Sequence, residues 1–412
     1  MKGSAGVAAC DATLKRLLQK VARQVFAKGD LVPTGMVLQV SVPASASSLA
    51  EYLGLATFSD RESYHSRMQS FVNAGAVTLE WDRNAGIGGQ LSRVMLSDPA
   101  VVAELLGVDL PWVVARESIS SLEATAKEGL PPISHILDGW RHGKAPGGVS
   151  ASNVAQFVDS LRVIEAANRL GASELDLLLR RVSAQLFGDS KRIEALAKPL
   201  AYLLGEADGD AEEDVFARLG LVKYPQPMLI SGSKSCCVRM GDDLLPLARP
   251  YLGLRPDTID AMEVGNAPIR RVLTIENLAS FNEAAQDIYN PVDLLLIYVA
   301  GQPTPSLLAA YRRILKTVAP ASVMHWGDID VGGFQIAARL ADAAGEVGCR
   351  LSLWRMNPQE AASSKIGQAE QSKVDRTMAI CGQYGWTNEL NGLQSHPFFQ
   401  EQEFLEWVPP LE

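Results

Sequence analysis

The segment HWGDIDVGGF, residues 325–334, decides how the C-terminal part of this chain is expected to fold. It follows the apolar residues ASVM and leads into a helix-like stretch, GGFQIAARLADAAGEVG. Asp328 and Asp330 stand one residue apart, although neighbouring carboxylates repel each other and resist burial unless a cation pairs with them. Gly332 and Gly333 permit a tight strand-to-helix turn and the close approach of a ligand. The segment therefore predicts a strand end that presents two acids to a cation.

Strand-like and helix-like segments alternate on both sides of this stretch. Apolar strands are expected at 270–277, 293–301, 321–330 and 349–356, and helices at 278–289, 306–318 and 332–348. Strands that alternate with helices of this length predict an α/β domain with a parallel, Rossmann-like sheet covered on both faces.

The acids of this domain are expected to share one edge of the sheet. Glu276 ends the first strand, Asp328 and Asp330 end the third, and ligands bind outside the carboxyl ends of parallel strands. An isolated pair of aspartates is most often a solvated turn, but Glu276 at the matching edge favours a metal site. Carboxylate oxygens without His or Cys suit Mg²⁺ or Mn²⁺ rather than zinc, and such ions usually serve phosphate chemistry.

The preceding sequence predicts two further regions. Residues 1–115 have the helix, strand, glycine-rich turn and strand order of a winged-helix-like arm, with a helix at 59–74 that Ser59 is expected to cap together with Glu62. Residues 116–265 are expected to form a helical and winged-helix-like DNA-binding region of CAP type, and residues 266–412 the catalytic domain. Lys191 and Arg192 lie in a basic cluster that either contacts DNA phosphates or forms a solvated helix face.

Composition and charge narrow the class of protein. The chain has 412 residues, 47% of them hydrophobic and 21% charged, which is ordinary for a globular protein of two or three domains. The odd number of cysteines, five, without a CxxC pair argues against a disulfide framework or a structural zinc site. We found no signal peptide and no membrane span, so we expect a cytoplasmic, nucleoid-associated protein. The net charge of −9 disfavours DNA binding through bulk charge alone.

Several segments carry a family resemblance. Glu276 in TIEN, together with the acids of GDIDVGG, resembles the Toprim fold of topoisomerases, primases and some nucleases. VLTIENLASFN, HWGDIDVGGFQI, FGDSKRIEAL and FFQEQEFLEW resemble segments of the JetD subunit of Wadjet plasmid-defence systems and of its relative MksG. The likeness is strongest over the last third of the chain.

The resemblance implies a Mg²⁺- or Mn²⁺-dependent endonuclease of double-stranded DNA, related to the A subunit of topoisomerase VI. Glu276, Asp328 and Asp330 would be its metal-binding catalytic acids. It would act as a homodimer beside a complex of SMC-like ATPase, kleisin and kite proteins. Topoisomerase VI also uses a tyrosine nucleophile, but neither Tyr202 nor Tyr224 lies in a paired-tyrosine context. Water is therefore the expected nucleophile.

Three residues and two other functions complete the expectations. Glu401 and Glu403 in QEQEF either add a carboxylate to the metal site or lie on an exposed terminal helix, and Glu403 is retained as a metal-ligand candidate. His325 is expected to be packed or hydrogen-bonded rather than to act as a base. The alternative functions are a topoisomerase VI-like transesterase and a non-catalytic Toprim scaffold that binds DNA or partners.

Overall fold

The computed structural model divides the chain into two compact units. They comprise residues 1–161 and 162–412, and we treat each by itself. The structure describes residues 5–32, 40–43, 45, 49–82, 90–171, 175–205, 214–265, 268–287, 290–360, 370–397 and 399–410.

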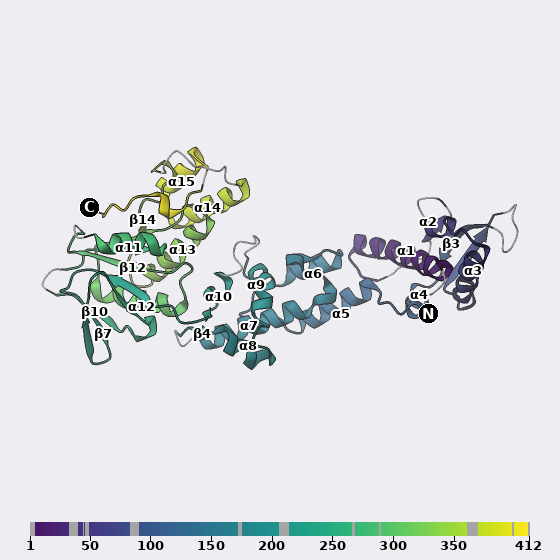
Figure 1. Ribbon diagram of the computed structural model, residues 1–412, viewed down its shortest axis with the longest axis horizontal. Helices are drawn as coiled ribbons and strands as arrows, with labels where there is room; N and C mark the ends of the chain where they lie inside the picture. Colours follow the sequence, from purple (N-terminus) through teal and green to yellow (C-terminus); the bar gives the residue numbers. More distant parts are fainter. Residues whose placement is uncertain are drawn as a thin grey trace. The chain divides into compact units, whose positions relative to one another are not determined.

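The first unit begins with a small α+β arrangement (Figure 1). Its helices are α1 (Ala5–Lys28), α2 (Ala50–Leu53) and α3 (Phe58–Asn73). Its strands are β1 (Ser41–Pro43), β2 (Val77–Trp81) and β3 (Leu91–Leu96), which form an antiparallel sheet in the order β1-β3-β2. The expected helix and two strands are present as α3, β2 and β3, whereas the glycine-rich turn expected between the strands, at 83–89, lies outside the described residues.

Helix α3 starts one residue before the predicted start, because a different side chain caps it. Thr57, not Ser59, is the N-cap, and its hydroxyl accepts a hydrogen bond from the Asp60 N–H. Asp60 stands three residues after Thr57, and the two side chains are joined at 2.6 Å. The side-chain cap is therefore present two residues earlier than predicted.

Helices make up the rest of the first unit and the start of the second. They are α4 (Pro99–Leu106), α5 (Pro111–Glu123), α6 (Ser134–Arg141), α7 (Ala155–Gly171), α8 (Leu179–Phe187), α9 (Ala197–Leu203) and α10 (Asp214–Arg218). Two short parallel strands, β4 (Leu177–Leu178) and β5 (Leu221–Val222), also occur in the second unit.

A six-stranded mixed sheet forms the centre of the second unit, in the order β14-β13-β11-β12-β6-β9. Four neighbouring strands are parallel: β11 (Arg271–Ile275), β12 (Leu294–Tyr298), β13 (Ser322–Trp326) and β14 (Leu351–Leu353). The other two, β6 (Met228–Ser231) and β9 (Leu252–Leu254), are antiparallel to their neighbours. The sheet therefore crosses the domain boundary expected at residue 265, because β6 and β9 extend it beyond β12.

A second, antiparallel sheet lies before β11 in the chain. Its order is β10-β7-β8, with β7 (Cys237–Met240), β8 (Asp243–Pro246) and β10 (Ala261–Glu263).

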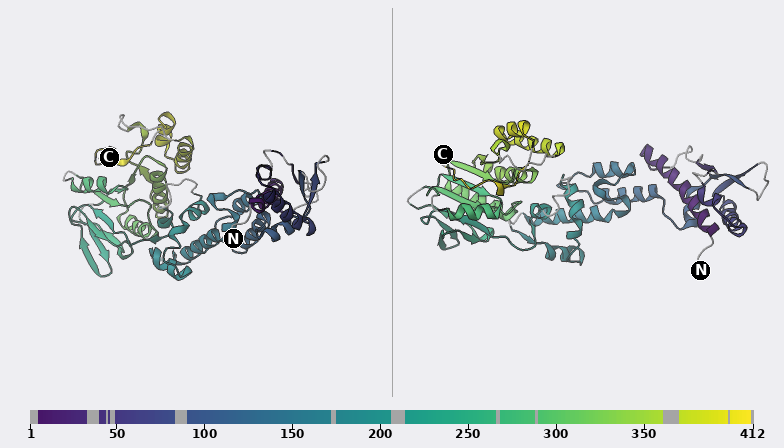
Figure 2. Two further views of the ribbon diagram at one scale, coloured as in Figure 1. Left: turned by 45° about the vertical axis from the view of Figure 1, so that its right-hand side comes forward. Right: turned by 45° about the horizontal axis from the view of Figure 1, so that its top comes forward.

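Helices cover the large sheet. They are α11 (Leu278–Gln286), α12 (Pro305–Val318), α13 (Val331–Gly345), α14 (Gln371–Tyr384) and α15 (Thr387–Ser395). Strands β11, β12 and β13 are buried along nearly their whole length, as expected for a sheet covered on both faces. Both views of Figure 2 show the yellow helices α14 and α15 together beside the sheet. Among the described residues, none of the helices combines the length and apolar composition that a membrane crossing requires.

Candidate functional site

Two of the predicted acids meet where neighbouring parallel strands end. Because β11 and β13 pair with Ile275 opposite Trp326, the residues that follow them emerge side by side. The Glu276 N–H donates to the Trp326 carbonyl at 3.0 Å. In return, the Asp328 N–H donates to Glu276 Oε2 at 3.2 Å. The expected shared edge is therefore present, and we call it the acid edge: Glu276, Asp328 and Asp330.

The aspartate pair lies beyond the strand rather than in it. We predicted a strand to residue 330, but β13 ends at Trp326, and Asp330 is the N-cap of α13. Asp330 Oδ1 accepts the Gly333 N–H at 2.7 Å, as a helix N-terminus favours. Gly333 is required for this turn, because an added Cβ would lie 2.2 Å from the Asp328 carbonyl oxygen.

The surroundings of Asp328 disfavour its ionised form. Burial raises its pKa to about 7, and the negative charges of Glu401 and Asp330 act in the same direction. A hydrogen bond at 2.6 Å from the Gln402 N–H opposes this increase, because it stabilises the ionised form. A cation bound nearby would stabilise the ionised form of this carboxyl.

The chain's last described segment, residues 399–410, runs along the acid edge, and we call it the C-terminal strap. Gln400 and Ile329 exchange backbone hydrogen bonds at 2.8 and 3.0 Å. Glu401 follows Gln400 directly, and its negative charge favours the protonated form of Asp328. Glu403 instead accepts a hydrogen bond from Asn277 Nδ2 at 2.8 Å. The structure therefore places Glu401, rather than the retained candidate Glu403, against Asp328.

The donor set suits a hydrated hard cation better than a closed cage. Within the described residues, no group of three or more His, Cys, Asp and Glu side chains is placed to hold a metal ion. Mg²⁺, however, usually binds through one or two carboxylates and keeps several waters or substrate phosphates. Among the described residues, the buried amide donor Gln402 Nε2, next to the acids, has no hydrogen-bond partner. Such a donor is suited to hydrogen-bond water or phosphate oxygens around an ion.

His325 is packed beneath the acid edge, as predicted. It is fully buried, and burial lowers its pKa to about 3, so the ring is neutral. Its Nδ1 lies 2.9 Å from Thr274 Oγ1, whose hydroxyl donates to the Met324 carbonyl at 3.1 Å. With the Thr274 hydroxyl donating to Met324, a proton on Nδ1 lets His325 donate to Thr274, while Nε2 has no hydrogen-bond partner among the described residues.

The predicted DNA-contacting residues lie away from these strand ends in the sequence, in the turn after α8. Lys191 is exposed, and its N–H donates to Asp189 Oδ1 at 2.8 Å. Arg192 is half-buried. Arg180, Arg181 and Lys198 of the same cluster are exposed, and Arg180 forms an ion pair with Glu194 at 3.2 Å.

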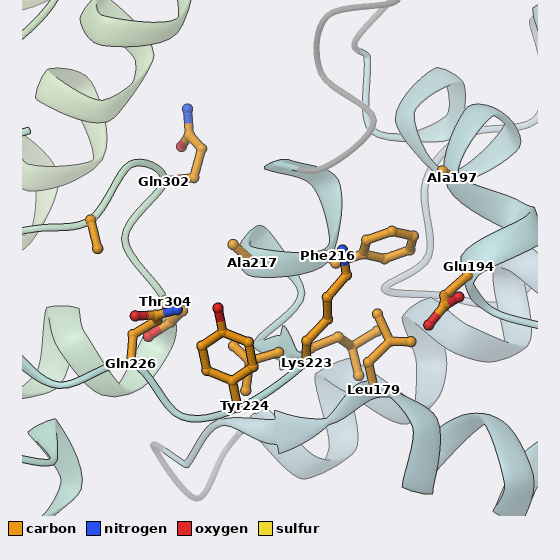
Figure 3. Close-up of a pocket in the computed structure, with 13 residues that line it drawn as sticks. Leu179, Glu194, Ala197, Phe216, Ala217, Lys223, Tyr224, Gln226, Gln302 and Thr304 are labelled. Carbon is orange, nitrogen blue, oxygen red and sulfur yellow. The ribbon is translucent and has the colours of Figure 1, made fainter. Parts of the chain in front are cut away.

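A cavity of about 490 Å³ opens at the end of β12 (Figure 3). Ala300, Gln302 and Thr304, which follow β12, line it together with residues from the helical segments and the β5 region. Ala300 has a φ of 56°, which is unusual for a residue other than glycine and typical of functional loops. Figure 3 shows the Tyr224 ring within this lining, and the residue is 64% exposed. Tyr202, the other candidate nucleophile, lies in α9 and is half-buried.

Comparison with known proteins agrees with the family resemblance. Residues 244–376 match the family described as Wadjet protein JetD, C-terminal. The chain resembles JetD. The Wadjet protein JetD of Bacillus cereus (strain Q1) is 26% identical over 180 residues, which are 42% of this chain and 43% of that protein.

The JetD resemblance covers less than half of either protein in this pair. Its family match includes all three residues of the acid edge but ends before the C-terminal strap. Glu401 and Gln402 consequently enter the site through the tertiary structure. The sequence signals for them were the repeated acids of QEQEF and the resemblance of FFQEQEFLEW to a JetD segment, and Gln402 was missed.

Proposed function

We propose that the chain is a divalent-metal-dependent endonuclease that cleaves double-stranded DNA within a Wadjet-type defence complex. The observation that carries this proposal is the meeting of Glu276 and Asp328 at adjacent parallel strand ends, within the segment that matches JetD. We also propose that the α/β domain has the Toprim fold.

Glu276, Asp328 and Asp330 would hold Mg²⁺ or Mn²⁺. Bound there, the ion would polarise a phosphoryl oxygen and favour ionisation of water. The chain's own residues orient the carboxylates: the Gln402 N–H fixes Asp328, and the Gly333 N–H fixes Asp330. In hydrolysis, the water oxygen forms a bond to phosphorus while one phosphoester P–O bond breaks.

The partners follow from the JetD resemblance and the reaction. Cutting both strands requires two active centres or one centre used twice, which favours a homodimer. An SMC-like ATPase with kleisin and kite proteins would present the DNA. Lys191 and Arg192 would contact its phosphates.

Plasmid cleavage by Asp328→Ala tests the activity. We expect Mg²⁺- or Mn²⁺-dependent cleavage to fall by about 10²-fold or more, since the substitution removes a carboxylate that would bind the catalytic metal ion. Asp242→Ala is the matched control, because Asp242 is exposed in the turn between β7 and β8. Full cleavage by purified, folded Asp328→Ala protein would refute the assignment.

Tyr224 supports a second candidate, a topoisomerase VI-like transesterase. Its exposure in the cavity beside the end of β12 leaves its hydroxyl accessible. Attack by this oxygen on phosphorus would break a P–O bond and leave DNA attached to Tyr224. Denaturing gels of the reaction, with Tyr224→Phe as the control, distinguish the two functions: a covalent adduct that Tyr224→Phe abolishes would replace hydrolysis.

A further inference from the structure

The C-terminal strap is a fixed part of the second unit. Leu405 is buried in the hydrophobic core, and the Trp407 ring packs against Trp326 with centroids 5.7 Å apart. Trp407 Nε1 also donates to Asp287 Oδ2 at 3.1 Å, and Arg271 donates to the Pro410 carbonyl. These anchors hold residues 400–403 against the acid edge.

Within the strap, Gln402 joins the ends of β11 and β13. Its N–H donates to Asp328 Oδ1 at 2.6 Å, and its Oε1 accepts the Asn277 N–H at 2.9 Å. The preceding residue, Glu401, is exposed. It stands between Gln400, whose backbone pairs with Ile329, and Gln402, whose N–H binds Asp328, so its carboxyl lies near that of Asp328. Neighbouring carboxylates repel each other, and a shared cation removes this repulsion.

A second observation indicates what lies between them. Gln402 is 1% exposed, yet its Nε2 has no hydrogen-bond partner among the described residues. The amide is held at the acid edge by its own Oε1, so the orphaned N–H groups lie there too. Burying an amide donor without an acceptor is costly. An ion-bound water or a phosphate oxygen at this place would satisfy it.

We propose that Glu401 and Asp328 together bind one divalent cation, with Gln402 Nε2 donating to a water or phosphate oxygen on that ion. This site adds a strap carboxylate to the acid edge and lies outside the family match. It deepens the proposed nuclease function and rests on it. Oxygen ligands without His or Cys favour Mg²⁺ or Mn²⁺ over zinc.

Mn²⁺ titration of the full chain, followed by calorimetry and by the shift in melting temperature, tests the site without a cleavage assay. Glu401→Gln should weaken Mn²⁺ binding by roughly tenfold or more, because ligand charge sets the affinity of such sites. Glu403→Gln is the matched control: it removes the same charge from the same strap, but at a side chain that binds Asn277. Its affinity should stay within about twofold of wild type, as for an exposed charge.

A double-mutant cycle sharpens the result. If one ion joins both carboxylates, Asp328→Asn and Glu401→Gln should each weaken binding, and the double variant should lose much less than the product of the two effects. The metal-free melting temperature of Glu401→Gln should be no lower than that of wild type, since a like charge beside Asp328 is removed.

Wild-type affinity in Glu401→Gln, an equal loss in Glu403→Gln, or no Mn²⁺ binding by the wild-type chain would each overturn the site. The proposed function fails by a different result, full plasmid cleavage by Asp328→Ala. If Glu401→Gln retains metal binding and Asp328→Ala is inactive, Glu401 is not a metal ligand, but the proposed nuclease function stands.

Discussion

At the residue scale, Gly327 leaves room for the half-buried Glu276 and the buried His325 beside it. A Cβ at this position would lie 2.4 Å from Glu276 Oε2 and 2.7 Å from His325 Nε2. Gly327→Ala should therefore displace Glu276 and reduce cleavage by about 10²-fold, the usual effect of a displacement near 1 Å. It should also lower the free energy of unfolding by about 1–3 kcal/mol through overpacking.

Gly382→Ala is the control for this prediction, measured by the same cleavage assay and thermal melts. Gly382 lies in α14 with nothing within 4 Å of an added Cβ, so alanine there should leave cleavage unchanged and stabilise the helix slightly. Unimpaired cleavage by Gly327→Ala would show that Glu276 is not required at its observed position.

Asp328 makes the stability of the metal-free chain depend on pH. Its folded-state pKa, about 7, lies above the ordinary value of 3.8. Between these two pKa values the folded chain holds a proton that the unfolded chain has released. The stability that the protonated Asp328 contributes is therefore fully present below pH 3.8 and is lost as pH rises through 7. With EDTA present, the melting temperature of wild type should fall more between pH 5 and pH 8 than that of Asp328→Asn.

Asp328→Asn is the informative substitution because an amide oxygen still accepts the Gln402 N–H, while the titrating proton is gone. Equal pH dependence in the two proteins would contradict the account of Asp328. Added Mg²⁺ should restore stability at pH 8 in wild type and less in the variant.

At the element scale, the turn after α8 is the predicted DNA contact. Lys191→Glu with Arg192→Glu should weaken binding to unrelated DNA sequences and lower the slope of log affinity against log salt by about 2, one for each lost phosphate contact. Lys191→Gln with Arg192→Gln should weaken binding less, since no repulsion is introduced. Fluorescence anisotropy at several salt concentrations measures both effects, and unchanged affinity would indicate a solvated surface.

At the scale of the whole molecule, the net charge of −9 opposes the approach of DNA to the isolated chain. We expect weak, nonspecific cutting by the chain alone and efficient cutting only when an SMC-type partner presents bent or trapped DNA, because relaxed DNA must otherwise supply the bending energy itself. Plasmid cleavage with and without the partner complex and ATP measures this. Efficient cutting of relaxed plasmid by the isolated chain would exclude such gating.

The sequence by itself determined the alternating strands and helices around residues 271–353, because buried parallel strands require long apolar runs between amphipathic helices. It also determined that Glu276 and Asp328 share an edge, since the carboxyl ends of parallel strands lie together. These features depend on local patterns and on one general rule of α/β topology.

Only the tertiary structure decided which further residues join that edge. The strap brings Glu401 and Gln402 to Asp328 across more than 70 residues of sequence, through contacts of Leu405 and Trp407 that no local pattern encodes. Strands β6 and β9 likewise join the sheet from outside the alternating segment. The structure also ends β13 at Trp326 and makes Asp330 the N-cap of α13, since its carboxylate accepts the Gly333 N–H at the start of that helix.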